Sequence, residues 1–189
     1  RKVLSSLDEI QETFTSSGTT GSSTSKHLVT NINLYKESYL KGFAHFYGNI
    51  EEYTVLALLP NFLERQGSSL VFMVADLIEK SKKAASGFYL DNIQELADKL
   101  LELNRNGQKT LLIGVSFALL DLIEMQQFNL KNTIIMETGG MKGRRKELVR
   151  EELHTILKDG FGVTEIHSEY GMTELLSQGY SKGNGVFET

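Results

Sequence analysis

TLLIGV (Thr110–Val115) is followed at once by FALLDLIEMQ (Phe117–Gln126), and this pair of segments decides the fold. The first segment is a short apolar run, which is typical of a strand that is buried on both faces of a sheet. The second segment predicts a helix that begins where the strand ends. A buried strand that runs directly into a helix is the repeating unit of a mostly parallel α/β sheet.

The same alternation of strands and helices continues in both directions along the chain. Ser68 and Asp91 are expected to cap helices, and Gly107 and Gly160 are expected to end them. The expected strands are Glu12–Thr15, Leu28–Thr30, Glu52–Leu59, Gly87–Leu90, Thr110–Val115, Thr133–Glu137 and Val163–His167. The expected helices are Asn33–Tyr47, Ser68–Lys83, Asn92–Gly107, Phe117–Gln126 and Lys146–Lys158.

This pattern predicts an α/β fold with a mostly parallel sheet and helices on both of its faces. In such sheets ligands bind at the carboxyl ends of the strands. Polar turns follow three of the expected strands, which makes these turns the candidate binding loops. They are residues 16–25 after Glu12–Thr15, residues 139–143 after Thr133–Glu137, and residues 170–174 after Val163–His167.

The composition excludes several classes of protein. The chain has 189 residues, 40% of them hydrophobic, which suffices for the core of one domain or one large lobe. Its net charge of −4 gives no electrostatic basis for a nucleic-acid partner, and no apolar run approaches the roughly 20 residues of a membrane span. The absence of cysteine excludes disulfides and thiolate metal sites within this chain, and it suits a cytoplasmic protein. Because the chain begins with Arg1 rather than Met, we expect it to be a piece of a longer protein.

The loop TFTSSGTTGSSTSKH (Thr13–His27) combines glycines, hydroxyls and one lysine. Glycines let backbone N–H groups turn toward an anion, and hydroxyls add further donors, so the composition suits a phosphate-binding loop. It suits a flexible polar linker equally well. The loop is not a Walker A motif, because no glycine–lysine pair follows Gly18 at the required spacing.

The two later turns have their own chemistry. The pair Gly139-Gly140 allows a flat ligand to approach the backbone, although an ordinary strand-to-helix connection explains it as well. The segment 170–174 places three chemical groups close together. The ring of Tyr170 suits a base, the hydroxyl of Thr173 suits a phosphate oxygen, and the carboxylate of Glu174 suits Mg²⁺. A surface turn that opens a helix is the alternative for this segment. The basic residues 142–146 are expected to be a solvated helix start.

Taken together, the three loops resemble those of the adenylate-forming superfamily, which includes acyl- and aryl-CoA ligases, luciferases and peptide-synthetase adenylation domains. Tyr170-Gly171-Met172-Thr173-Glu174 is similar to its Tyr-Gly-x-Thr-Glu signature, and Gly139-Gly140 to its adenine-contacting glycine pair. The residues that match its phosphate loop are Ser16, Ser17, Gly18, Thr19, Thr20 and Gly21. The segments YGMTELLSQGYS, ERQGSSLVFM and LLIGVSFALLDL most resemble the acyl-protein synthetases of the bacterial luciferase fatty-acid reductase system.

The resemblance implies an enzyme that joins a carboxylate, here a fatty acid, to ATP and passes the acyl group to a protein thiol. It implies that Thr19, Thr20 and Gly21 of the phosphate loop bind the β- and γ-phosphates, and that Tyr170 lies at the adenine opposite Gly139 and Gly140. It also implies that Gly171 belongs to the nucleotide-binding residues. Thr173 would contact the α-phosphate and Glu174 would carry Mg²⁺, so these two are the expected catalytic residues. Relatives line the acyl chain near Phe62, Leu63 and residues 116–118, although core packing also explains these apolar positions.

Some features depart from the family pattern. The family loop continues Gly-x-Pro-Lys, whereas here Thr24 occupies the lysine position and Lys26 comes two residues later. Lys26 is a candidate for binding phosphate from this position, and a solvated or helix-facing lysine is the alternative. The ribose-binding aspartate, the hinge and the C-terminal lobe lie downstream in relatives, so residues 1–189 are expected to be a partial adenylation domain that is inactive alone. Two alternatives remain open. One is an acyl- or aryl-CoA ligase resembling phenylacetate–CoA ligase, and the other is a non-catalytic nucleotide-binding lobe.

Overall fold

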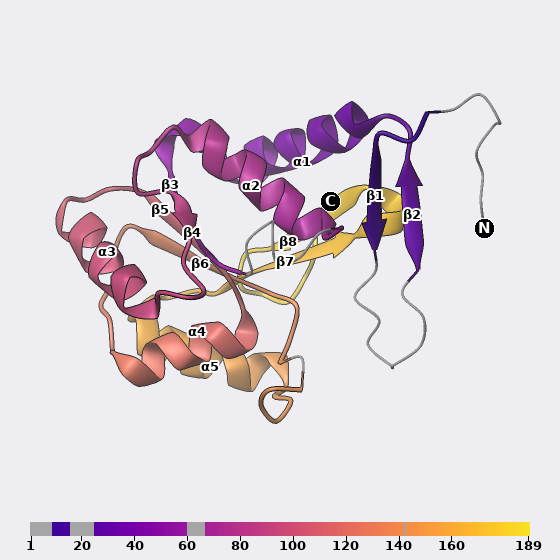
Figure 1. The fold of residues 1–189 in the computed structure, drawn as a ribbon. Coiled ribbons are helices and arrows are strands. Elements are labelled where there is room, and N and C mark those ends of the chain that lie inside the picture. The colour runs from indigo at the N-terminus through magenta and orange to yellow at the C-terminus, as the bar shows by residue number, and fades with distance from the viewer. Residues whose placement is uncertain (1–8, 16–24, 60–66, 142) are drawn as a thin grey trace.

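A computed structural model describes residues 9–15, 25–59, 67–141 and 143–189 of the chain. The expected phosphate-loop residues 16–21 lie outside the described residues, as do Phe62, Leu63 and Lys142. The rest forms a six-stranded sheet, a separate two-stranded sheet and five α-helices (Figure 1).

The six-stranded sheet has the order β4-β3-β5-β6-β7-β8. Neighbouring strands are parallel except for β7 and β8, which are antiparallel. All residues of β3 and β5 are buried, as expected for central strands covered on both faces. The strands are β3 (Thr54–Leu58), β4 (Gly87–Phe88), β5 (Thr110–Val115), β6 (Thr133–Thr138), β7 (His167–Met172) and β8 (Ser177–Ser181).

Helices cover both faces of this sheet, which confirms the predicted fold class. In Figure 1, α1 and α2 lie above the sheet, and α4 and α5 lie below it. Short 3-10 turns, η1 (Ile50–Glu52) and η2 (Thr173–Leu175), precede β3 and follow β7. The helices are α1 (Ile32–Tyr47), α2 (Ser69–Ser81), α3 (Ile93–Arg105), α4 (Ser116–Met125) and α5 (Arg150–Phe161).

The expected strand Glu12–Thr15 does not belong to the mostly parallel sheet. β1 (Glu12–Thr15) exists, but it pairs antiparallel with β2 (Lys26–Val29) in a separate sheet. Phe14 anchors this hairpin, because its ring contacts Tyr35 of α1 at 5.4 Å and Phe72 of α2 at 5.6 Å between centroids. The hairpin therefore packs against the helices and does not extend the sheet.

Several helix ends also differ from the prediction. Ser68 caps α2 as expected, but Asn92 rather than Asp91 caps α3, and its side chain accepts from the N–H of Glu95. α5 begins at Arg150 rather than at Lys146, and it ends at Phe161, followed by the C-cap Gly162 with a φ of 66°. Gly160 is inside α5 and buried. Gly162, which has the left-handed conformation, ends the helix, whereas Gly160 has a packing role.

The last parallel strand lies later than the predicted Val163–His167. It spans His167–Met172 and continues into an antiparallel partner, β8, that the sequence did not reveal. Polar residues alternate with small ones in β8, so it lacks the apolar run that marks the central strands. Among the described residues, no helix is long and apolar enough to cross a membrane.

Two helix-interior glycines give a test of the packing between α4 and α5. A methyl group at Gly160 would lie 2.6 Å from Cδ1 of Ile123 in α4, whereas one at Gly42 in α1 would have ordinary contact, 3.8 Å, with Tyr180. We expect Gly160→Ala to lower the free energy of unfolding by about 1–3 kcal/mol through overpacking. Gly42→Ala should raise it by roughly 0.5–1 kcal/mol, the usual gain in a helix. Chemical denaturation measures both, and a stabilising Gly160→Ala would contradict the close approach of α4 and α5.

Candidate functional site

The candidate site lies where β6 and β7 end. β6 ends at Thr138, and the next two residues, Gly139 and Gly140, have φ values of 75° and 65°. These are left-handed conformations that residues with a side chain rarely adopt, so the turn depends on glycine. Both glycines are exposed, which leaves their backbone open to a flat ligand.

Tyr170 and Gly171 are inside β7 and not in a loop after it, which corrects the predicted position. Side chains alternate along a strand, so Tyr170 points to the face opposite that of Glu169. Its side chain is 59% exposed, and its ring has an edge contact with Phe187 at 6.1 Å between centroids. An exposed aromatic face of this kind can stack on a base.

Thr173 and Glu174 begin η2, directly after β7. The Thr173 hydroxyl lies 2.9 Å from that of Ser69, the first residue of α2. Glu174 is exposed and stands at the end of the strand. Thr173 is thus held by a partner, whereas the Glu174 carboxylate is open to solvent.

The hairpin brings the root of the first loop to the same region. The Thr15 N–H donates to the carbonyl of Gly67 at 2.7 Å, and Gly67 lies two residues before Ser69. Ser69 in turn contacts Thr173. Lys26 is exposed and pairs with Thr15 in the register of β1 and β2, so it stands at the base of the same loop.

A buried polar cluster beneath the site was missed in the sequence. The Glu137 carboxylate accepts from the Ser168 hydroxyl at 2.6 Å and from the Ser116 hydroxyl at 3.3 Å, and its Oε1 lies 3.5 Å from Nε2 of His154. Burial raises the pKa of Glu137, but its interactions with His154 and Ser168 and the nearby charge of Arg150 together hold it below its usual value. An acidic residue at the end of an apolar strand was the available signal.

Glu169 is a second buried acid, on the other face of the sheet. Its Oε2 accepts from the Thr138 hydroxyl at 2.8 Å, while its Oε1 has no hydrogen-bond partner within the part of the chain that the structure describes. Burial raises the pKa of Glu169 to about 7, against the lowering effect of the Thr138 hydrogen bond and with a further increase from the charge of Glu137. Sequence reasoning assigned Glu169 no role.

Other predicted positions are structural. Ser116, Phe117 and Ala118 are buried in the core at the start of α4, with Ser116 bonded to Glu137. The basic residues 144–146 do not start a helix, because α5 begins at Arg150. Arg144 and Lys146 are exposed as expected, whereas Arg145 pairs with Asp121 and Glu124 of α4. The guanidinium of Arg144 stacks over the Phe117 ring at 4.8 Å.

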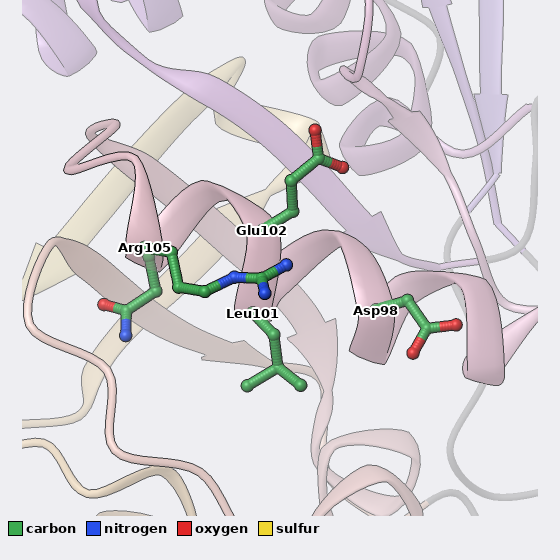
Figure 2. Close-up of a pocket in the computed structure, with 5 residues that line it drawn as sticks. Asp98, Leu101, Glu102 and Arg105 are labelled. Atoms are coloured by element: carbon green, nitrogen blue, oxygen red, sulfur yellow. The ribbon is translucent and has the colours of Figure 1, made fainter.

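A hollow on the surface of α3 is separate from these residues. It is lined by one side of that helix, with Leu101 between the charged side chains of Asp98, Glu102 and Arg105 (Figure 2). None of the lining residues belongs to the ends of β6 or β7, so this hollow is not part of the candidate site.

The residues of the site fit a nucleotide and a divalent cation. The open glycine backbone and the exposed Tyr170 ring suit a base, and the hydroxyl of Thr173 suits a phosphate oxygen. Among residues 9–15, 25–59, 67–141 and 143–189, no three His, Asp or Glu side chains are grouped as metal ligands. Mg²⁺ usually takes one or two carboxylates together with phosphates and waters, so Glu174 suffices as its protein ligand.

Comparison with known proteins identifies the fold. No family model matches the sequence, and no curated protein matches it. Similar solved structures include an ATP-bound RpMatB–BxBclM chimera (TM-score 0.63, 15% identity, 95% of this chain and 32% of the other). They also include the AMP complex of O-succinylbenzoate coenzyme A synthetase (MenE) from Bacillus subtilis (TM-score 0.55, 20% identity, 93% and 32%). McyG A-PCP complexed with phenylalanyl-adenylate is a third (TM-score 0.61, 16% identity, 93% and 31%).

At these identities the similarity shows that the fold is shared. The chain spans about a third of the length of each of the three proteins. Its mixed α/β architecture, with a mostly parallel sheet between helices, is the architecture of the matching part of each.

The raised pKa of Glu169 predicts a pH dependence of stability. The pKa of Glu169 is 4.5 in the unfolded chain and about 7 in the folded protein, so the folded state binds the proton more tightly. This proton binding stabilises the folded state at low pH, and the stabilisation is lost as the pH rises from 4.5 to 7. We expect Glu169→Gln to be more stable than the unchanged protein above pH 7, by at most about 3 kcal/mol, and to lose this advantage near pH 4.5. Denaturant unfolding at pH 5 and pH 8 measures the difference.

Burial also lowers the pKa of His167, so this residue contributes to the pH dependence as well. His167 is the same in the unchanged protein and in Glu169→Gln, so its effect cancels when the two are compared at each pH. An equal stability difference at the two pH values would show that Glu169 does not carry this titration.

Proposed function

We propose that the chain is part of an adenylation domain of the adenylate-forming superfamily and that it helps to activate a carboxylic acid with ATP. The observation that carries the proposal is the convergence of the glycine pair, Tyr170 and Thr173 at one end of the sheet. The shared fold supports it, since the similar structures are complexes with ATP, with AMP and with phenylalanyl-adenylate. We further propose that residues 1–189 form only part of this domain and that a C-terminal lobe lies elsewhere in the complete protein.

The proposed reaction has two steps. An oxygen of the substrate carboxylate attacks the α-phosphorus of ATP, the bond to the β-phosphate oxygen breaks, and acyl-adenylate and pyrophosphate form. A thiolate then attacks the acyl carbon and releases AMP. The carboxylate is already ionised at neutral pH, so the first step needs no protein base.

The main obstacle is electrostatic, because an anion approaches a polyphosphate. Hydrogen-bond donors at the α-phosphate lower this barrier, which is the role we assign to the Thr173 hydroxyl. Mg²⁺ held by Glu174 would offset the charge that moves onto pyrophosphate. The adenine would be bound by Gly139, Gly140, Tyr170 and Gly171. The outer phosphates would be bound by residues 16–21 together with Lys26.

For the substrate and acceptor we propose a fatty acid and a protein thiol, in the manner of acyl-protein synthetases. The support is the resemblance of the segments around Tyr170, Ser68 and Gly114 to those enzymes. An acyl- or aryl-CoA ligase is the second candidate, because one structure with the same fold is a coenzyme A synthetase. Both candidates use ATP and a thiol, which suits a cytoplasmic location.

The test of this function is carboxylate-dependent exchange between ATP and pyrophosphate, measured on the full-length protein without CoA. We expect exchange with long-chain fatty acids and little with short or aromatic acids. Exchange confined to aryl acids, followed by thioester formation with CoA, would instead support the ligase. Absence of exchange with every acid, while Mg-ATP still raises the melting temperature, would indicate a lobe that binds nucleotide without catalysis.

The metal assignment has its own test. We expect Glu174→Gln to reduce exchange at least about tenfold and to raise the Mg²⁺ concentration needed for half-maximal rate, because one anionic ligand is lost. The matched control is Glu188→Gln, which removes an exposed carboxylate from the segment that pairs with Tyr180. If the Mg²⁺ dependence is the same in both variants, Glu174 does not hold the metal.

A further inference from the structure

β6 and β7 form a fork at the candidate site. The register pairs Met136 with His167 and Glu137 with Ser168, and no pair between these two strands follows. β7 continues to Met172 paired with β8 alone. The turn after Thr138 therefore leaves the sheet, whereas Tyr170 and Gly171 continue in β7 without a partner in β6.

Two side-chain hydrogen bonds cross this fork, one on each face of the sheet. On the α5 face, the Ser168 hydroxyl donates to the Glu137 carboxylate at 2.6 Å. One residue further on, and on the opposite face, the Thr138 hydroxyl donates to Glu169 at 2.8 Å. The second bond joins the residue before Gly139 to the residue before Tyr170.

Both bonds are strong and shielded from water. All four residues are buried, with exposures between 1% and 8%. Hydrogen bonds to a carboxylate are shorter and stronger than those between neutral groups, and a low local dielectric strengthens them further. Glu137 is also held by Ser116 and His154, so the first bond joins β7 to a fixed point.

We propose that these two hydrogen bonds act as clasps that set the distance between the glycine backbone and the Tyr170 ring. Glu137, Thr138, Ser168 and Glu169 are then positioning residues for nucleotide binding, because they act through their neighbours and not by touching the ligand. Backbone pairing cannot fix this distance, since the ladder between β6 and β7 ends at Glu137 and Ser168. The inference rests on the proposed function, because it takes a nucleotide as the ligand of the fork.

The test is the binding of AMP to the full-length protein, measured by titration calorimetry. We expect Thr138→Val, which keeps the shape and removes the hydroxyl, to raise the Kd for AMP about tenfold, roughly the effect of losing one buried hydrogen bond. Thr138→Ser keeps the hydroxyl and should bind AMP within about twofold of the unchanged protein. Ser168→Ala removes the other clasp and should weaken AMP binding to a similar extent.

The matched control is Thr133→Val, the same substitution at the start of the same strand. The Thr133 hydroxyl is buried and has no hydrogen-bond partner among the described residues, so its loss should leave AMP binding unchanged. The inference is overturned if Thr138→Val and Ser168→Ala bind AMP as the unchanged protein does. It is also overturned if Thr138→Ser or Thr133→Val weakens binding as much as Thr138→Val, since a general loss of packing would then explain the effect.

Failure of the proposed function gives a different result. In that case the unchanged protein binds neither AMP nor Mg-ATP, and the inference falls with it. Melting temperatures identify any variant that fails to fold, and because the two clasps lie on opposite faces, Ser168→Ala tests the inference independently of Thr138→Val.

Discussion

The rest of this end of the molecule depends on the hydrogen bonds that compensate the buried carboxylate of Glu137. A charge that is removed from water is very costly unless several partners compensate it. Here the partners come from different elements: Ser116 at the start of α4, His154 in α5, and Ser168 in β7. Satisfying one side chain therefore fixes the relative positions of β6, β7 and the two helices beneath them.

The opposite face of the sheet is fixed by aromatic packing and a second hydrogen-bonded chain. The Tyr35 hydroxyl donates to the carbonyl of Ser69 at 3.0 Å and accepts from the side-chain amide of Gln178 at 2.8 Å. Burial and the nearby Glu169 raise the pKa of Tyr35, so its hydroxyl keeps its proton as a donor. This chain links α1, α2 and β8, and it places Ser69 beside Thr173.

The two faces together explain why polar groups meet at one end of the sheet. Three segments that are more than 30 residues apart in sequence converge there: the root of the first loop, the glycine pair and the end of β7. Each has exposed groups that suit a part of a nucleotide, and each is supported by buried bonds from behind. A rigid support is what a site needs if it is to hold reacting groups in a fixed geometry.

The sequence alone determined the fold class, because the buried strands are apolar runs and the helices are periodic. It also indicated three candidate loops. Each loop alone has an ordinary explanation, and only their order and their positions after expected strands favoured a binding site. It placed Val163–His167 and Gly160 wrongly, because polar strands lack an apolar signal and a helical glycine at a close contact resembles a stop.

Only the tertiary structure decided which residues support the site. Four polar residues that support the site are buried in pairs, and nothing in the sequence around each of them shows this pairing. They are Glu137, Thr138, Ser168 and Glu169. Their partners lie 31 residues apart, and the register of two parallel strands brings them together. Register follows from packing over the whole sheet, so the physical reason for these pairs is long-range and cannot be read from one segment.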